Sequence, residues 1–477
     1  MTVEALKAHL ERGGQILKTR DDHEPVLLDR KTGTPDSGPF TLPADSKCTW
    51  AKPEETFGLE KLRPRIEPWL TALVQSEHLS LLIGSGLTHA VHRLATGESL
   101  PGMDTVTFES LNAEITQEAK RTATAAGRED GNFEDQVRVA NELLRGIEIL
   151  AASKPDGSRE HAQVEAVRHG LKAALQTFAK SILQGERNIA TASAEVREEA
   201  FNYLVSFLMS FASRTGTRER LQCFTTNYDR FVEAGSDVAG LRLIDRFVGA
   251  MAPVFRASRV DVDLHYSPPG IRGEPRYLEG VARFTKLHGS VDWIDGDGSI
   301  RRIGLPFGAE DTKPYLEAPG LERIDATRLM IYPNAAKDRE TTAYPYVELF
   351  RDFAVSVCRP NSTVICYGYS FGDEHINRVI EDMLTIPSAH LVIIAYGDPL
   401  GRIMRTYERL GRQAQVTLLI GDHLGELQTL VDHYLPKPAI DRTTFRMAEF
   451  LKARWGTQPR ADSDTESPPA NEGGSPS

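Results

Sequence analysis

Short apolar and β-branched runs that stop at turn residues recur along the chain and alternate with segments of helical periodicity. Such runs occupy residues 79–83, 223–226, 364–367, 391–395 and 416–420. Runs of this length between turn residues are typical of strands that are buried on both faces. Helical patterns lie between them, for example at 347–357 and 375–384. The alternation predicts an α/β fold with an open, doubly wound, mostly parallel sheet of the Rossmann-like kind.

The segment from about residue 109 to 220 breaks this rhythm, because it shows helical periodicity without a convincing strand. In the first of three such stretches, apolar residues recur at steps of four and three: Phe133, Val137, Ala140, Leu144 and Ile147. This spacing is that of an amphipathic helix. The sequence therefore predicts an all-helical subdomain inserted after the first βα unit.

The two ends of the chain differ in composition from this core, which spans residues 76–435. Residues 1–75 begin with a polar, turn-rich stretch and are predicted to be an extension or adaptor rather than a second core. Residues 436–455 are predicted to form a C-terminal helix. Residues 456–477 combine Pro, Gly, Ser and charge with almost nothing to bury, which predicts a disordered tail.

Composition narrows the class of protein. Of 477 residues, 40% are hydrophobic, which suffices for a sizeable core, and the net charge of −11 argues against direct nucleic-acid binding. The four cysteines form no C-x-x-C pair, so neither a zinc site nor a disulfide framework is predicted. No apolar run approaches the roughly 18 residues of a membrane span, and the N-terminus has no apolar signal stretch. We therefore expect a cytoplasmic protein without a membrane partner.

The first candidate site is a glycine-rich turn between a predicted strand and a predicted helix. It contains Gly84, Ser85, Gly86 and Thr88. Glycines permit a tight turn and close approach of a ligand, and the amides at the start of the helix favour a phosphate. The alternative is a plain strand–helix corner, because His89 stands where a dinucleotide fingerprint has its third glycine.

Polar residues follow two further strands. Asn227 and Asp229 come directly after the run at 223–226, where ligands bind in parallel sheets; the alternative is that one of them caps the next helix. His288 precedes Gly289, and histidine is the usual general base near neutral pH. The alternative for His288 is a structural or surface role, which is the commoner one among 13 histidines.

A fourth motif follows the run at 364–367. Gly368 and Ser370 could shape and hydrogen-bond a phosphate-rich ligand, whereas the simpler interpretation is a turn in which Asp373 starts a helix. A weaker motif, Tyr-Gly-Asp-Pro at 396–399, is explained equally well as a strand exit.

Together and in this order, Gly-x-Gly-x-Thr, Thr-x-Asn-x-Asp, Leu-His-Gly and Gly-x-Ser resemble the NAD-binding core of sirtuins. The strings LHGSVDW and GYSFGDEHIN, with LPGMD at 100–104, resemble the sirtuin-like NAD-hydrolases of bacterial antiphage defence. The resemblance covers roughly residues 76–435 and implies a sirtuin-type sheet. It implies that NAD⁺ contacts Gly84, Ser85, Gly86 and Thr88 with its phosphates and ribose, Asn227 and Asp229 with its nicotinamide ribose, and Gly368 and Ser370 with its adenosine side.

The resemblance also makes His288 the catalytic histidine and assigns Asn227 to hold the ribose or the attacking water. Deacylating sirtuins carry a four-cysteine zinc module after Leu-His-Gly, but no cysteine lies between His288 and Cys358. The intervening segment, which includes residues 332–346, is therefore expected to be a metal-free connection.

The expected activity is that of an NAD⁺ glycohydrolase, which cleaves NAD⁺ to ADP-ribose and nicotinamide. Two alternatives stay open: an NAD-dependent protein deacylase and a non-catalytic NAD- or ADP-ribose-binding scaffold. The resemblance further implies a homo-oligomer and a HerA-type hexameric ATPase as partner. Glu134, at the start of a predicted helix, is explained by the helix dipole and is left outside the site.

Overall fold

The computed structural model describes residues 3–30, 39–44, 46–100, 105–125, 130–214, 218–257, 263–266, 276–296, 299–316 and 344–437. The chain divides into two units, Met1–Pro436 and Lys437–Ser477, and all but one of the described residues belong to the first. The predicted tail at 456–477 lies outside the described residues. Three other predicted segments lie wholly or partly outside the described residues. They are the helix at 436–455 after Lys437, the LPGMD motif after Leu100, and the metal-free connection as far as residue 343.

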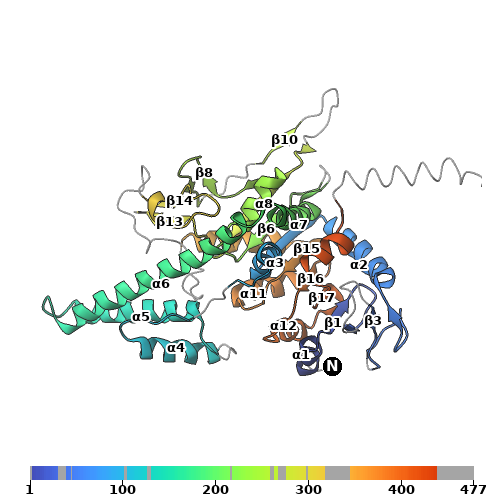
Figure 1. The fold of residues 1–477 in the computed structure, drawn as a ribbon, viewed down its shortest axis with the longest axis horizontal. Helices are drawn as coiled ribbons and strands as arrows, with labels where there is room; N and C mark the ends of the chain where they lie inside the picture. Colours follow the sequence, from blue (N-terminus) through green and yellow to red (C-terminus); the bar gives the residue numbers. More distant parts are fainter. Residues whose placement is uncertain are drawn as a thin grey trace, which may run out of the picture. The chain divides into compact units, whose positions relative to one another are not determined.

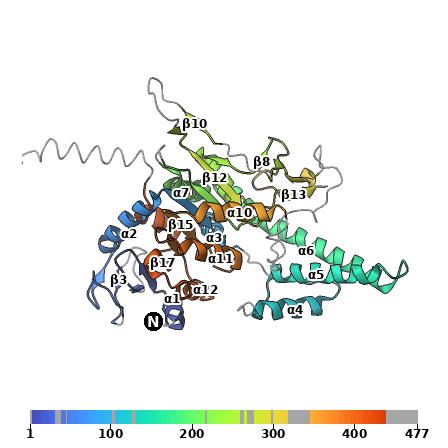
Figure 2. The ribbon, with the colours of Figure 1, turned by 180° about the vertical axis from the view of Figure 1, so that it is seen from behind.

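A large, mostly parallel sheet forms the centre of the first unit, which confirms the predicted α/β class (Figures 1 and 2). Its eleven strands lie in the order β4-β3-β2-β1-β17-β16-β15-β5-β6-β12-β7, and the strands from β17 to β7 run parallel. These parallel strands are β5 (His78–Ile83), β6 (Gln222–Thr225), β7 (Arg242–Ile244), β12 (Val281–Lys286), β15 (Ser362–Tyr367), β16 (His390–Ala395) and β17 (Val416–Ile420).

The N-terminal segment continues this sheet. Strand β1 pairs antiparallel with β17, and three more antiparallel strands follow it outward. They are β1 (Gln15–Lys18), β2 (Val26–Arg30), β3 (Phe40–Thr41) and β4 (Thr56–Phe57). Ile16 and Leu17 are fully buried in the two cores of the sheet. The described strands β1 to β4 of this segment therefore extend the central sheet, and the segment belongs to the same unit as the core.

Helices cover both faces of the sheet. One face carries α2 (Leu59–Val74), α3 (Ser85–Thr96), α7 (Ala194–Ala212), α8 (Phe231–Ala239) and the C-terminal segment α13–η4 (Leu427–Thr429 and Leu430–Tyr434). The other face carries α1 (Val3–Glu11), α10 (Tyr346–Val357), α11 (Glu374–Leu384) and α12 (Arg402–Leu410). Alternate strand residues supply the two cores, because successive side chains point to opposite faces.

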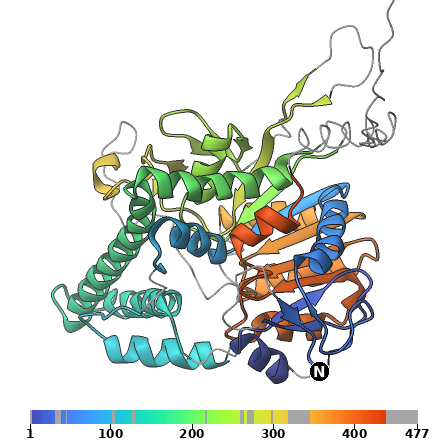
Figure 3. The same ribbon diagram turned by 45° about the vertical axis from the view of Figure 1, so that its right-hand side comes forward.

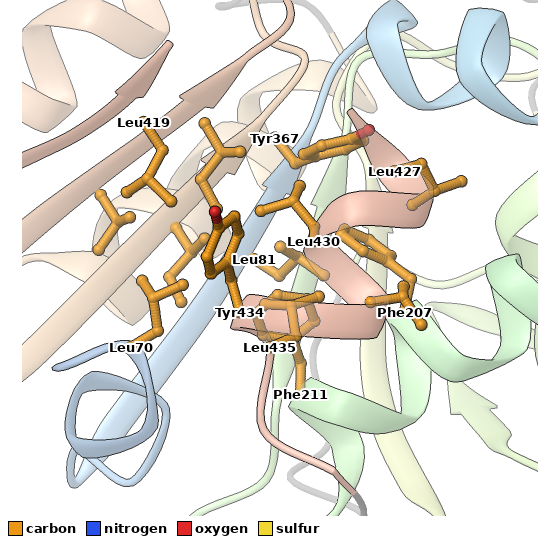
Figure 4. Close-up of a cluster of buried hydrophobic side chains, with 14 of the residues drawn as sticks. Leu70, Leu81, Phe207, Phe211, Tyr367, Leu419, Leu427, Leu430, Tyr434 and Leu435 are labelled. Carbon is orange, nitrogen blue, oxygen red and sulfur yellow. The ribbon is translucent and has the colours of Figure 1, made fainter. Parts of the chain in front are cut away.

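Figure 4 shows the first of these cores. Leu81, Tyr367 and Leu419 from three strands lie beside side chains of α2, α7 and η4. In η4, Tyr434 is fully buried, so the end of the described chain is anchored in the core of the sheet.

The described residues between 105 and 214 contain helices and no strand, as the helical periodicity of this segment predicts. Its helices are α4 (Asn112–Ala125), α5 (Phe133–Ala151), α6 (Arg159–Ala190) and α7, of which α7 packs on the sheet. Helices α4, α5 and α6, which we call the helical arm, lie side by side (Figure 3). They share a hydrophobic core of their own, in which the rings of Phe133 and Phe178 stack with their centroids 4.5 Å apart. Asn132 and Asp135 form a capping box that begins α5, with Glu134 in its first turn.

Short elements that the sequence pattern does not predict follow β7 and β12. A four-stranded small sheet has the order β13-β14-β9-β8, and a two-stranded ribbon pairs β10 with β11. The bounds are β8 (Phe247–Val248), β9 (Val254–Phe255), β10 (His265–Tyr266), β11 (Arg276–Tyr277), β13 (Trp293–Gly296), β14 (Ser299–Arg302) and η1 (Lys313–Tyr315). A further short helix, η3 (Gln413–Gln415), lies between α12 and β17.

Candidate functional site

The four predicted motifs meet at one edge of the sheet. They follow β15, β5, β6 and β12, which are neighbours in that order and run parallel, so their carboxyl ends lie together. The strand order reverses at β5. The next strands of the chain in this sheet, β6, β7 and β12, are added on one side of β5, and the later strands β15, β16 and β17 are added on its other side. Parallel α/β sheets bind ligands in the crevice that such a reversal of strand order creates. All the predicted site residues therefore lie at the carboxyl ends of four neighbouring parallel strands, next to the reversal of strand order.

The glycines of two motifs contact each other through their backbones. The Gly84 amide donates to Tyr367 O and the Gly86 amide donates to Gly368 O, both at 3.0 Å. A Cβ atom on Gly86 would lie 2.5 Å from Gly368 Cα, and Gly368 has a φ of +62°. Side chains are excluded by this close approach, and the amide of Gly86 is satisfied within the protein. Packing thus requires these glycines, whatever ligand the turn binds.

Asn227 is fixed by hydrogen bonds to the glycine turn. Its Nδ2 donates to Gly84 O at 3.0 Å and to Thr88 Oγ1 at 2.9 Å, and Thr88 Oγ1 donates to Asp229 Oδ2 at 2.7 Å. Asp229 Oδ1 accepts from the amide of Phe231, the first residue of α8, although the N-cap position of that helix is Arg230. Among the described residues, no donor is bonded to Asn227 Oδ1. This oxygen is the acceptor that the side chain can offer to a ligand.

His288 is held by a carboxylate from the neighbouring motif. Its Nε2 lies 2.8 Å from Asp373 Oδ2, and Asp373 Oδ1 accepts from the amide of His375 at the start of α11. The side chain of His288 is 19% exposed, whereas that of Asp373 is 4% exposed. A neutral imidazole bonded to a carboxylate through Nε2–H keeps the lone pair on Nδ1, which can then accept a proton. The sequence predicted that Asp373 starts the helix, which is correct, but did not predict its bond to His288.

A buried lysine supports the loop after β6. Lys286 Nζ donates to Asp229 O at 2.5 Å and to Glu233 Oε1 at 2.9 Å. Desolvation raises the pKa of Glu233, and the lysine charge opposes that rise. Lys286 also lines a cleft together with Trp293, and none of the predicted site residues lines that cleft. The role of Lys286 is therefore to hold the loop that carries Asn227 and Asp229.

A buried ion pair connects the helical arm to the same loop. Glu186 of α6 is fully buried and accepts from the Arg230 amide at 2.9 Å, from Nε at 3.1 Å and from Nη2 at 2.5 Å. Arg230 also donates to Leu305 O and Pro306 O, which follow the small sheet. Burial raises the pKa of Glu186, and the Arg230 guanidinium opposes that rise. Nothing in the sequence links these two residues, because they lie 44 positions apart in segments without a shared motif.

The two predicted serines are more exposed than Asn227 and His288. Ser85 and Ser370 are both exposed, so their hydroxyls are accessible to a ligand at the crevice. Ser370 lies on the β15 side and Ser85 begins α3 on the β5 side. No predicted site residue is displaced from the edge of the sheet.

Comparison with known proteins adds no assignment: the chain matches no family model, and no curated protein matches it. Within the described part of the chain, no group of three or more His, Cys, Asp or Glu side chains is placed to hold a metal ion. No described helix has both the length and the apolar character that a membrane crossing needs. The functional argument therefore depends on the motifs and on the geometry of the crevice.

Proposed function

We propose that the protein is an NAD⁺ glycohydrolase built on a doubly wound, Rossmann-like core of the sirtuin type. One observation carries the proposal. Asn227 and His288 follow adjacent parallel strands at the reversal of strand order, each is held by a partner from another motif, and each keeps one polar atom for a ligand.

The chemistry suits these two groups. Cleavage breaks the bond between the ribose C1′ and the nicotinamide nitrogen, and the bonding electrons leave with neutral nicotinamide. The ribose carries the positive charge in an oxocarbenium-like transition state, and water adds to C1′ with loss of one proton. The protein must orient the ribose, place the water and accept that proton. The protein need not protonate the leaving group, because the nicotinamide ring is already cationic in NAD⁺ and becomes neutral as it leaves.

Asn227 supplies orientation. Both hydrogens of its amide are directed to protein acceptors, so Oδ1 faces the ligand as a fixed acceptor for a ribose hydroxyl or for the water. Such a preorganised group costs little reorganisation when the transition state forms.

His288 supplies the base. Its bond to Asp373 fixes the ring and stabilises the imidazolium that forms when Nδ1 takes a proton from the ribose hydroxyl or the incoming water. Because Asp373 is buried and also caps α11, its position is determined by the fold and not by the ligand.

The absence of cysteine between His288 and Cys358 favours hydrolysis over deacylation, since the zinc module that accompanies the acyl-lysine surface in deacylating sirtuins has no ligands here. We extend the proposal to a role in antiphage defence, as a cytoplasmic homo-oligomer with a HerA-type ATPase as partner. That extension is supported by the sequence resemblance.

The test is product analysis. The purified full-length chain, alone and with a candidate ATPase partner, is incubated with NAD⁺, and products are separated by chromatography. We expect nicotinamide and ADP-ribose in equal amounts, with no dependence on an acetylated peptide. Deacetylation of that peptide would replace the proposal with the deacylase, and tight NAD⁺ binding without cleavage under all conditions would replace it with the scaffold.

A further inference from the structure

We propose that Thr88 and Asp229 are positioning residues that fix the orientation of the Asn227 side chain and act through it rather than through contacts with NAD⁺. This inference rests on the proposed function, and it changes the roles that the sequence resemblance implies for Thr88 and Asp229. Thr88 lies in the first turn of α3, and Asn227 and Asp229 lie in the loop between β6 and α8. The three residues therefore follow two neighbouring parallel strands, β5 and β6.

The backbone at Asn227 is held by hydrogen bonds that do not involve Thr88. The amide of Asn227 donates to Thr225 Oγ1 at 3.1 Å, and that hydroxyl donates to Ile83 O at 3.1 Å. The amide of Thr226 also donates to Ile83 O at 3.1 Å, so the start of the loop is bonded to the end of β5. The hydroxyl of Thr88 therefore affects the side chain of Asn227 and not the position of its backbone.

The hydrogen bonds among the three side chains have a single direction. An ionised carboxylate offers acceptors alone, so the hydroxyl of Thr88 donates its one hydrogen to Asp229 Oδ2, at 2.7 Å. That hydroxyl then has only lone pairs for Asn227, and it accepts from Nδ2 at 2.9 Å. Gly84 O, which is also an acceptor alone, takes the second hydrogen of Nδ2 at 3.0 Å. Asp229 thus enforces, through Thr88, the orientation that leaves Asn227 Oδ1 for a ligand.

A rotated Asn227 amide would be disfavoured at both of these contacts. Turning the amide by half a revolution would place Oδ1 against Gly84 O and against a hydroxyl oxygen whose hydrogen is already donated to Asp229. Thr88 and Asn227 are buried, with 7% and 9% exposure, so solvent does not replace the two lost bonds. The network therefore keeps Asn227 in the orientation in which it accepts from a ribose hydroxyl or from the attacking water.

The position of Asp229 is determined by the protein. Its Oδ2 accepts from Thr88, its Oδ1 accepts from the amide of Phe231 at 3.2 Å, and its backbone oxygen accepts from Lys286 Nζ at 2.5 Å. These donors belong to α3, α8 and β12. Because three elements fix this carboxylate before any ligand binds, it is suited to hold a neighbouring side chain in place.

The experiment measures kcat and KM for NAD⁺ cleavage by the full-length chain. Thr88→Val nearly keeps the shape of the side chain but removes its hydroxyl, so Asn227 Nδ2 has only one acceptor left. We expect kcat to fall about 5- to 30-fold, with KM changed by less than about twofold. Thr88→Ser keeps the hydroxyl and should recover most of the rate. The matched control is Thr124→Val on α4, an exposed residue whose hydroxyl donates to Lys120 O within its own helix.

Asp229→Asn tests the direction of the bonds. Its amide nitrogen can donate to Thr88, which frees the hydroxyl hydrogen to point at Asn227 and allows the Asn227 amide to rotate. Its amide oxygen can still accept from the amide of Phe231, so the bond to the start of α8 is kept. We expect kcat to fall about 3- to 10-fold. If Thr88→Val does not fold in a thermal unfolding assay, Asp229→Asn provides the same test.

Each change is also combined with Asn227→Ala. Residues that act through Asn227 should have no further effect on the rate once its side chain is absent. Three results would overturn the inference and leave the proposed function standing. They are an unchanged kcat in Thr88→Val and Asp229→Asn, a raised KM alone, which would mean direct contact with NAD⁺, and an equal further loss in the Asn227→Ala protein. A wild-type protein that cleaves no NAD⁺ would refute both proposals.

Discussion

The two halves of the crevice are built in different ways. In the first half, the turns after β5 and β15 contact each other through the backbone, and Gly84, Gly86 and Gly368 leave no room for a Cβ atom. In the second half, the loops after β6 and β12 carry polar side chains that bond across to the first half, Asn227 to the turn after β5 and His288 to Asp373 after β15. The first half therefore shapes the crevice, and the second half supplies its chemistry.

The difference teaches which substitutions test the fold and which test the function. Glycine in the first half is explained by packing alone, so its presence is weak evidence for a phosphate. Asn227 and His288 are not needed to fill a core, and each has an atom directed away from its protein partner. A functional explanation is therefore stronger for the second half.

The largest effect is expected for Gly368→Ala. The new side chain would adopt a left-handed backbone conformation and lie 2.5 Å from Gly86 Cα, which we expect to cost roughly 2–5 kcal/mol of unfolding free energy. Gly397→Ala, at the end of β16, is the matched control, because no atom lies within 4 Å of its Cβ position and its φ is not left-handed. Denaturant unfolding measures both, and equal stability of the two variants would contradict the packing account.

Glu186→Gln tests how the second half is held. The change removes the hydrogen-bonded counter-charge of the buried Arg230 guanidinium, which we expect to cost about 2–4 kcal/mol. The cost is less than that of full removal of the partner, because Leu305 O and Pro306 O still accept from the guanidinium. Glu165→Gln on the same helix is the control, since that carboxylate is 72% exposed. Chemical denaturation should separate the two. A Glu186→Gln protein as stable as the control would show that the arm does not support the loop.

Asn227→Ala should reduce activity more than stability. We expect kcat for NAD⁺ cleavage to fall about 100-fold or more, because the ribose or water loses its fixed acceptor. The control is Asn141→Ala on α5 of the helical arm, whose side chain donates to Val137 O within its own helix. Steady-state rates and melting temperatures are measured together. An unchanged kcat in a folded Asn227→Ala protein would mean that Asn227 has only the structural role of bonding its loop to the turn after β5.

The smallest effect is expected for Ser85→Ala. The side chain is exposed at the start of α3 and is not part of the glycine contact, so the fold should be unaffected. Loss of one neutral hydrogen bond to a ligand should raise KM for NAD⁺ about three- to tenfold. A large loss of stability would mean that the first half depends on side chains as well as on glycine backbone.

The sequence predicted the parallel strands well because strands buried on both faces have continuous apolar runs. The observed β5, β6, β15, β16 and β17 coincide with the predicted runs to within two residues at each end. It did not predict that the N-terminal segment joins the sheet, because β1 contains buried polar residues. Gln15 Oε1 accepts from two amides after β17, and Lys18 Nζ donates to Gln413 O and Val416 O. Such long-range partners have no sequence signal.

The candidate site shows the same limit. Motifs at strand ends predicted which side chains share an edge, since parallel strands place their carboxyl ends together. The pairing of His288 with Asp373 and of Glu186 with Arg230 depends on tertiary contacts over 85 and 44 residues. The small sheet was also missed, because two of its strands, β8 and β9, have only two residues each.

The central claim is that His288 acts as a base in NAD⁺ cleavage at this crevice. The direct measurement is nicotinamide release by His288→Ala, alongside NAD⁺ binding to the same protein and His169→Ala as an exposed-histidine control. We predict retained NAD⁺ binding, an unchanged melting temperature and a rate lower by about 10²- to 10⁴-fold, as expected for loss of a general base. Nicotinamide release at the wild-type rate by folded His288→Ala protein would contradict the account.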